Sequence, residues 1–420
     1  MEGKAPGQGS IAGSGAQRNT SSLIQYAQSH FDAAHFQGLM AIYGRPLNGR
    51  AVALSHDHGR KVVDFVRCSY LGLDNHPNII AGAIEALNKY GALHWSCART
   101  RLNFAILGEL EEALSDLFAA RVITYTTVLA ANMSALPVIA SGHLTDGVKP
   151  VIVFDRFAHA TLSFHKGTIA AETRVETIAH NDLDALETLC RANDCVAYIC
   201  DGVYSMGGSA NIRQLRSLQE RYGLFLYVDD AHGVSIFGAR GEGFARSQIG
   251  GSLGERTIIA ASLGKGFGAS GGMVMLGTAR QEELFRRFAV AHAFSASLNV
   301  AAIGAAMASQ ELHRTEELAL LQQTLKKRIA LFDSIVPTEQ NGSPLPIRTV
   351  EVGDELTAIA VARGLLDCGC YTSAIFFPTV ARGRAGLRLC PTAGHSQDEI
   401  RALGSALQHV LGEIGDVAVR

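Results

Sequence analysis

The chain has 420 residues and a mass of 44.6 kDa, and 47% of its residues are hydrophobic, which is enough for two lobes with large cores. Its formal net charge is -2 and its basic residues are scattered, so neither a nucleic acid nor an anionic membrane is an expected partner. No apolar run approaches the roughly 18 residues of a membrane span, and the eight cysteines show no C-x-x-C spacing, so we expect a cytoplasmic protein with reduced cysteines and no metal site.

The order of the expected elements predicts an α/β protein. Residues 1–20 are rich in Gly, Ser, Ala and Gln, which favours a mobile tail over a secretory signal. Residues 21–65 are expected to form a helix and short strands that pack on a partner subunit. Over residues 66–308, strand-like runs alternate with helical runs such as 183–189 and 212–220, which predicts a large domain with a mainly parallel sheet. Residues 309–420 are expected to form a smaller α/β domain behind a long linking helix over 310–333.

An anion site is predicted where a helix follows the short strand 122–125. Thr127 can cap that helix, which opens with Leu129 in an alanine-rich run. Free backbone N–H groups and the helix dipole favour a phosphate at such a start.

Three further strands run directly into polar residues. Parallel α/β sheets bind ligands at the carboxyl ends of their strands, so these residues are expected to meet in one cleft. The paired acids after strand 224–228 suit a cofactor ring nitrogen or a metal, and a solvated turn is the alternative. The lone histidine after strand 151–154 is by itself more typical of a loop. The residues concerned are Asp155 and His159, Asp201 and Ser205, and Asp229, Asp230 and His232.

The most informative segment is the glycine-rich run 262–268, in which Lys265 follows the apolar strand 257–261. Its amine suits a Schiff base with pyridoxal phosphate, because such a lysine condenses with the cofactor's aldehyde and later moves protons. A surface lysine is the plain alternative. A nucleotide-binding loop is excluded because the segment contains no G-x-x-x-x-G-K-[ST].

Taken together, these segments resemble the α-oxoamine synthase family of fold-type I pyridoxal-phosphate enzymes over residues 60–410. The resemblance implies a large domain with a seven-stranded, mainly parallel sheet, a smaller C-terminal domain and a homodimer with active sites at the interface. It also implies decarboxylative condensation of an amino acid with an acyl-CoA or acyl-carrier thioester, giving an α-amino ketone, coenzyme A and CO2. The motifs that carry it are 69–73, 129–132, 159–162, 180–182, 201–208, 229–233 and the lysine loop.

The resemblance also implies a role for each site residue. Lys265 would carry the cofactor, Asp229 would lie at the ring nitrogen, His232 at the phenolic oxygen and His159 on the ring face, and these four form the expected catalytic set. Other residues would line the cofactor, hold its phosphate or bind substrate. For the cofactor they are Thr127, Val128, Leu129, Asp201, Ser205, Ser262 and, from a second subunit, Ser295; for the substrate they are Arg388, Thr379 and His159.

One stretch departs from the family, and two other functions stay open. Residues 91–104 carry bulky and basic side chains, including Trp95, where several members have glycine and serine, which indicates a different substrate pocket. The sequence of residues 98–103 resembles that of family subgroups that serve signalling-molecule and natural-product pathways. The alternatives are a pyridoxal-dependent aminotransferase or aldolase, and a degenerate regulatory subunit.

Overall fold

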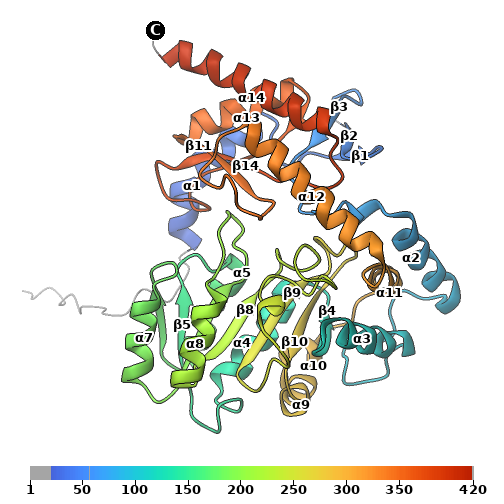
Figure 1. The fold of residues 1–420 in the computed structure, drawn as a ribbon, viewed down its shortest axis with the longest axis vertical. Coiled ribbons are helices and arrows are strands. Elements are labelled where there is room, and N and C mark those ends of the chain that lie inside the picture. Colours follow the sequence, from blue (N-terminus) through green and yellow to red (C-terminus); the bar gives the residue numbers. More distant parts are fainter. Residues whose placement is uncertain (1–19, 56, 419–420) are drawn as a thin grey trace, which may run out of the picture.

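The computed structural model describes residues 20–55 and 57–418. The expected mobile tail lies outside these residues except for Thr20, which begins helix α1 (Thr20–Phe36). Figure 1 shows two lobes, with the large sheet in the lower lobe and both the N-terminal and the C-terminal elements in the upper lobe.

The large lobe is built on a seven-stranded sheet in the order β4-β10-β9-β8-β7-β5-β6. Strand β10 runs antiparallel to both of its neighbours, whereas β9, β8, β7, β5 and β6 are parallel. The prediction of a seven-stranded, mainly parallel sheet is therefore confirmed. The strands are β4 (Arg121–Tyr125), β5 (Val151–Asp155), β6 (Val175–Ile178), β7 (Val196–Asp201), β8 (Phe225–Asp229), β9 (Thr257–Ser262) and β10 (Gly272–Leu276).

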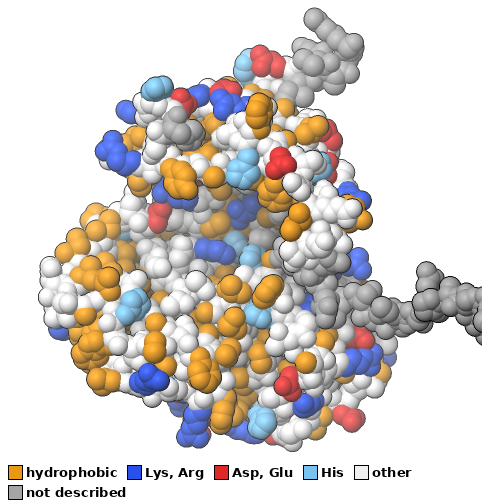
Figure 2. Space-filling view, turned by 180° about the vertical axis from the view of Figure 1, so that it is seen from behind, with side chains coloured by type: hydrophobic (Ala, Val, Ile, Leu, Met, Phe, Trp, Pro, Cys, Tyr) orange, Lys and Arg blue, Asp and Glu red, His pale blue; other side chains and the backbone are white. Residues whose placement is uncertain are grey.

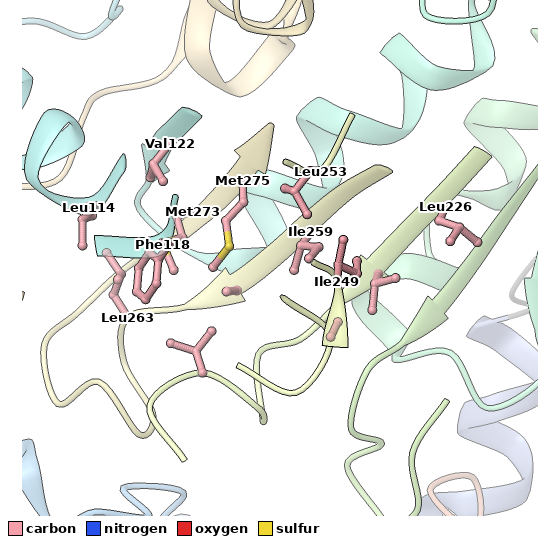
Figure 3. Packing of buried hydrophobic residues seen from close by; sticks show 14 of the residues in the cluster. Leu114, Phe118, Val122, Leu226, Ile249, Leu253, Ile259, Leu263, Met273 and Met275 are labelled. Atoms are coloured by element: carbon pink, nitrogen blue, oxygen red, sulfur yellow. The ribbon is translucent and has the colours of Figure 1, made fainter. Parts of the chain in front are cut away.

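Helices cover both faces of this sheet, so both faces are apolar. Successive side chains of a strand point to opposite faces, which is why Ile258 and Ile259 belong to two separate core clusters. Figure 3 shows Leu114 and Phe118 packed beside Met273 on one face. That face is covered by α2 (Pro77–Tyr90), α3 (Ala105–Phe118), α7 (Leu183–Ala192), α8 (Ile212–Tyr222) and α11 (Val300–Leu312); the other by α4 (Val128–Ala140), α6 (Lys166–Ala170), α9 (Ala279–Phe288) and α10 (Val290–Phe294).

The small lobe combines the two ends of the chain. Strand β12 (Cys370–Tyr371) pairs in parallel with β3 (Lys61–Asp64), so the N-terminal strands join the C-terminal domain. The expected helix and short strands over 21–65 are present, and their packing on a partner subunit stays a prediction. The remaining elements here are β1 (Gly44–Pro46), β2 (Ala51–Leu54), β11 (Arg348–Gly353), α13 (Glu355–Asp367), β13 (Ser373–Ile375), β14 (Ala385–Leu389) and α14 (Gln397–Ala418).

The long linking helix expected over 310–333 is present as α12 (Glu316–Ile335), but its predicted start is wrong, because α11 ends at Leu312 and a turn separates the two helices. The Thr315 side chain accepts from the N–H of Glu317 and so caps a new helix, whose first turn carries Glu316 and Glu317. A threonine followed by two acids is a helix start, and this signal outweighs the continuous apolar pattern around it.

A bridging segment, residues 65–75, connects the two lobes. Its backbone accepts hydrogen bonds from the small lobe at Phe65 (from Cys390 N, 2.8 Å) and at Tyr70 (from Ala393 N, 2.8 Å). It ends in a short 3-10 helix (Leu73–Asn75), and Leu73 lies against Gly268 of the lysine loop. None of the helices in the two described ranges is both long and apolar enough to cross a membrane.

We predict that Gly268→Ala destabilises the protein more than Gly59→Ala. Both glycines have φ of +78°, but a Cβ on Gly268 would clash with the Cβ and the backbone carbonyl of Leu73, whereas one on Gly59 would meet nothing within 4 Å. The left-handed backbone costs both variants about 1–2 kcal/mol, and the clash should add at least ~1 kcal/mol to Gly268→Ala. Equal urea midpoints for the two variants would contradict this account of the bridging segment.

Candidate active site

The candidate site lies between the lobes, at the carboxyl ends of the parallel strands. Figure 2 shows the surface hollowed between the lobes, with Lys or Arg and His side chains in the hollow. Strands β7 and β8 end in register at Asp201 and Asp229, and Asp229 pairs with Ala260 two residues before the end of β9. The sheet thus brings three predicted strand ends to one place, and the loop after β9 adds Lys265.

Lys265 contacts His232 and is largely withdrawn from water. Its Nζ lies 2.8 Å from His232 Nε2. Burial lowers the pKa of the lysine, and Arg388 lowers it further, against the opposing charges of Asp229 and Asp201. A lysine with a lowered pKa has more free amine at neutral pH, which suits a nucleophile and proton carrier.

Asp229 is held by donors on both of its oxygens. Its Oδ2 accepts from Asn132 Nδ2 at 3.0 Å, and its Oδ1 accepts from the N–H of Ala231 at 3.1 Å. The Tyr227 hydroxyl donates to Asn132 Oδ1 at 2.7 Å and so orients the amide. The two donors fix the carboxylate in place, as an acid that binds a pyridine nitrogen requires.

The neighbouring acid, Asp230, has a different environment. It follows β8 toward the other face of the sheet, where the N–H of Ala245 donates to its Oδ2 at 2.9 Å. Burial raises the pKa of Asp230 to about 8. Of the paired acids, Asp229 is the one whose charge acts on Lys265.

His159 begins helix α5 (Ala160–Ser163) and is tied to Asp201 by its backbone, whose N–H donates to Asp201 Oδ1 at 3.0 Å. The N–H of Thr161 donates to His159 Nδ1 at 3.3 Å, so the proton of the neutral ring is on Nε2. Burial lowers the pKa of His159, which keeps the ring neutral. Burial, followed by the charge of Asp229, raises the pKa of Asp201 well above its usual range.

The start of α4 is suited to a phosphate. Thr127 caps the helix, with its Oγ1 accepting from the N–H of Ala130 at 3.1 Å. Within the described ranges no group accepts from the N–H of Val128 or of Leu129. The Ser262 hydroxyl, which accepts from the N–H of Gly264 at 3.1 Å, retains its own proton for a further acceptor. These residues fit pyridoxal phosphate: an amine, an acid for the ring nitrogen and donors for the phosphate.

Arg388, on β14, is the substrate-binding candidate that the structure brings to this site. Its Nε donates to the Ser205 carbonyl at 2.7 Å, and its Nη2 lies 3.5 Å from Cys68 Sγ. No carboxylate of the described residues pairs with Arg388, which is 8% exposed. Burial acts to lower the pKa of Arg388, but the charges of Cys390, Tyr70 and Cys68 outweigh burial and raise it. A hydrogen bond with Cys390 and the charge of Arg388 lower the pKa of the Cys68 thiol to about 4, so this sulfur is the anionic group beside the guanidinium. A buried guanidinium that pairs with no carboxylate of the described residues is suited to a carboxylate supplied from outside.

Comparison with known proteins identifies the family. The sequence profile of aminotransferase class I and II matches residues 60–407. The chain belongs to this family. It is 32% identical over 367 residues to the 8-amino-7-oxononanoate synthase of Aromatoleum aromaticum (84% of this chain, 90% of that one), and 30% identical over 380 residues to that of Nitrosococcus oceani (88% and 97%). The fold matches the serine palmitoyltransferase of Sphingomonas wittichii with a TM-score of 0.81 at 21% identity, covering 95% of this chain and 99% of that one.

Within the family the chain is an α-oxoamine synthase, as the sequence motifs implied, and its cofactor is pyridoxal phosphate. The resemblance and the fold class are therefore confirmed. The roles of individual residues stay predictions that the geometry supports to different degrees.

Two predicted site residues do not join the others. Thr379 is exposed in the loop after β13, where its N–H donates to the Phe376 carbonyl at 2.9 Å. Ser295 follows α10, and among the described residues its Oγ donates to the Ala296 carbonyl alone, at 3.5 Å. Ser205 contributes its carbonyl, which accepts from Arg388, rather than its hydroxyl. The role of Thr379 in substrate binding and the role of Ser295 in a dimer stay predictions.

Three site residues had no role in the sequence analysis. Asn132 and Tyr70 lie in motifs that were recognised only as motifs, and Cys68 directly precedes one of them. Their partners, Asp229, His232 and Arg388, are 97, 162 and 320 residues away in the chain. The only available signal was that Asn132 and Tyr70 are polar residues inside matching motifs and that Cys68 adjoins one.

The departure over 91–104 has a structural explanation at one position. Arg99 is buried and its Nη2 lies 2.6 Å from Glu111 Oε1, while Arg286 contacts the second oxygen of Glu111 at 3.0 Å. Trp95 is half-exposed and stacks on Phe104, with 4.3 Å between ring centroids. The basic character of Arg99 therefore stabilises the fold, and the proposed pocket difference rests on the exposed residues around Trp95.

We predict that Asn132→Leu weakens cofactor binding about 10- to 100-fold, because the charged Asp229 loses a hydrogen bond worth ~1.5–3 kcal/mol. The cofactor's dissociation constant can be measured by absorbance after dialysis. Tyr227→Phe keeps the amide but removes its orienting hydroxyl, so it should weaken binding less. An unchanged dissociation constant in Asn132→Leu would show that Asp229 does not depend on this amide.

Proposed function

We propose that the protein condenses an amino acid with an acyl thioester, with loss of CO2, to give an α-amino ketone. The observation that carries this proposal is Arg388, a buried guanidinium that pairs with no carboxylate of the described residues and is close enough to Lys265 to lower the pKa of the lysine. Curated relatives over nearly the whole chain are named 8-amino-7-oxononanoate synthase, which supports the same reaction class.

Each residue of the site has a task in this reaction. When bound, pyridoxal phosphate withdraws electrons from the α-carbon of the amino acid. Asp229 keeps the ring nitrogen protonated, and Arg388 binds the amino acid's carboxylate. Lys265, with its lowered pKa, removes the α-proton as general base.

His159 has a second task beside the ring. Its Nε2–H is free of partners within the described ranges, since its Nδ1 takes the bonds from Thr161. We assign to it the orientation of the acyl carbonyl, whose oxygen gains negative charge when the thioester is attacked.

The site is completed by a second copy of the chain. The proposal that Ser295 reaches the partner's phosphate is supported by Phe294 beside it, which is 82% exposed, and by exposed Leu129 and Met133 on α4, which packs against α10. Figure 2 shows hydrophobic side chains spread over the large lobe. Large apolar side chains exposed together are typical of an interface. All eight cysteines are free of disulfides, in keeping with the proposed cytoplasmic location.

The test is release of free thiol when amino acids and acyl-CoAs of several chain lengths are mixed with the holoenzyme. We expect thiol and CO2 only when both substrates are present, and neither with Lys265→Ala. Amino-acid conversion without acyl-CoA would instead identify an aminotransferase or aldolase. A wild-type protein without bound cofactor would favour a regulatory subunit.

We predict that His159→Ala retains the cofactor's absorbance but lowers ketone formation about 100-fold or more, the usual scale for loss of a positioned donor. The matched control is His143→Ala, since His143 is exposed and its ring contacts only Ser141 among the described residues. Normal ketone formation by His159→Ala would remove His159 from the catalytic set.

A further inference from the structure

Tyr70, on the bridging segment, contacts the histidine that contacts Lys265. Its hydroxyl lies 2.7 Å from His232 Nδ1, and His232 Nε2 lies 2.8 Å from Lys265 Nζ. Tyr70 is 0% exposed and His232 is 6% exposed. The three side chains form a continuous hydrogen-bonded chain from the small-lobe side of the cleft to the reactive amine.

The protonation states of the two inner groups follow from burial. Burial raises the pKa of Tyr70 well above its usual range, and the nearby thiols of Cys68 and Cys390 raise it further, so the hydroxyl keeps its proton. Burial lowers the pKa of His232, with further lowering by Lys265, Arg388 and His159, so the imidazole is neutral. Each group therefore carries one proton to donate.

Two arrangements of these protons are possible, and the hydroxyl decides between them. If His232 Nδ1 donated to Tyr70, the buried O–H of Tyr70 would have to turn to the Cys68 sulfur, yet the hydrogen bond that this hydroxyl makes among the described residues is the one to Nδ1. If Tyr70 donates to Nδ1, its O–H is satisfied and the histidine proton lies on Nε2. The second arrangement leaves no buried donor without a good acceptor.

We propose that Tyr70 is a positioning residue that holds His232 in the tautomer whose Nε2–H points into the cofactor site. This inference rests on the proposed function, in which His232 donates to the cofactor's phenolic oxygen. Only a proton on Nε2 serves that purpose, because Nδ1 faces Tyr70.

The surroundings show why Tyr70 can hold this position. Its backbone carbonyl accepts from the N–H of Ala393, and its own N–H donates to the Cys68 carbonyl at 2.9 Å. Cys68, two residues earlier, lies beside Arg388. The same short segment therefore contacts the predicted carboxylate-binding group and, through His232, the lysine.

The variant that tests the proposal is Tyr70→Phe in the holoenzyme. The first readout is the pH titration of the bound cofactor's visible absorbance. A donor at the phenolic oxygen favours the deprotonated form, in which that oxygen is more negative, so weakening the donor should raise the midpoint by about half a pH unit or more. The second readout is steady-state kinetics, in which kcat should fall roughly tenfold with little change in KM for the amino acid.

Tyr198→Phe is the matched control. Tyr198 is also fully buried, and its hydroxyl donates to Asp155 at 2.9 Å, away from His232. This variant should leave the titration midpoint unchanged. A purely structural role of Tyr70 would likewise leave the midpoint at its wild-type value, and that result in Tyr70→Phe overturns the proposal.

A double-mutant cycle shows whether Tyr70 acts through the histidine. In a His232→Asn background, Tyr70→Phe should produce no further shift of the midpoint, and additive shifts would contradict the proposal.

Should Tyr70→Phe fail to fold, ¹⁵N NMR of labelled histidine in the wild-type holoenzyme answers the same question, since a proton on His232 Nδ1 would overturn the proposal. Thiol release by the wild-type enzyme together with an unshifted variant would refute the role of Tyr70 alone, whereas absence of cofactor absorbance in the wild type would refute the proposed function and this inference with it.

Discussion

Burial of the Lys265 amine near the Asp229 carboxylate is the interaction on which the rest of the site depends. Withdrawal from water lowers the pKa of the amine, while the carboxylate opposes part of that effect. The carboxylate itself is kept in place by Asn132 and by a backbone N–H. The Lys265 amine is thus ready to react, and the Asp229 carboxylate is placed to stabilise a positive charge on the cofactor's ring nitrogen. Both groups are fixed because they lie at the end of a sheet that is covered on both faces.

The fold provides this arrangement through simple geometry. Residues two apart on a strand share a face, so Tyr227 and Asp229 both point toward α4, and Asn132 connects them. The small lobe supplies Arg388 on β14, and the bridging segment brings Tyr70 to His232. Substrate binding and proton transfer therefore depend on contacts made by both lobes.

Local sequence patterns were sufficient for the sheet, the cap at Thr127 and the strand ends, because each depends on residues close together in the chain. The Tyr70 to His232 contact was not predictable in this way, because it joins residues 162 apart and depends on how the lobes pack. Burial of Arg99 against Glu111 also escaped prediction, since a basic residue in a loop is ordinarily expected at the surface. The break between α11 and α12 could have been found from Thr315 and the acids after it.

Every proposed role in the site requires that the cofactor is attached to one particular amine. Borohydride reduction of the holoenzyme, followed by digestion and mass spectrometry, identifies that amine. We expect a single pyridoxyl adduct, on Lys265. An adduct on another lysine, such as Lys166, whose pKa is also lowered by burial, or no adduct at all would contradict it.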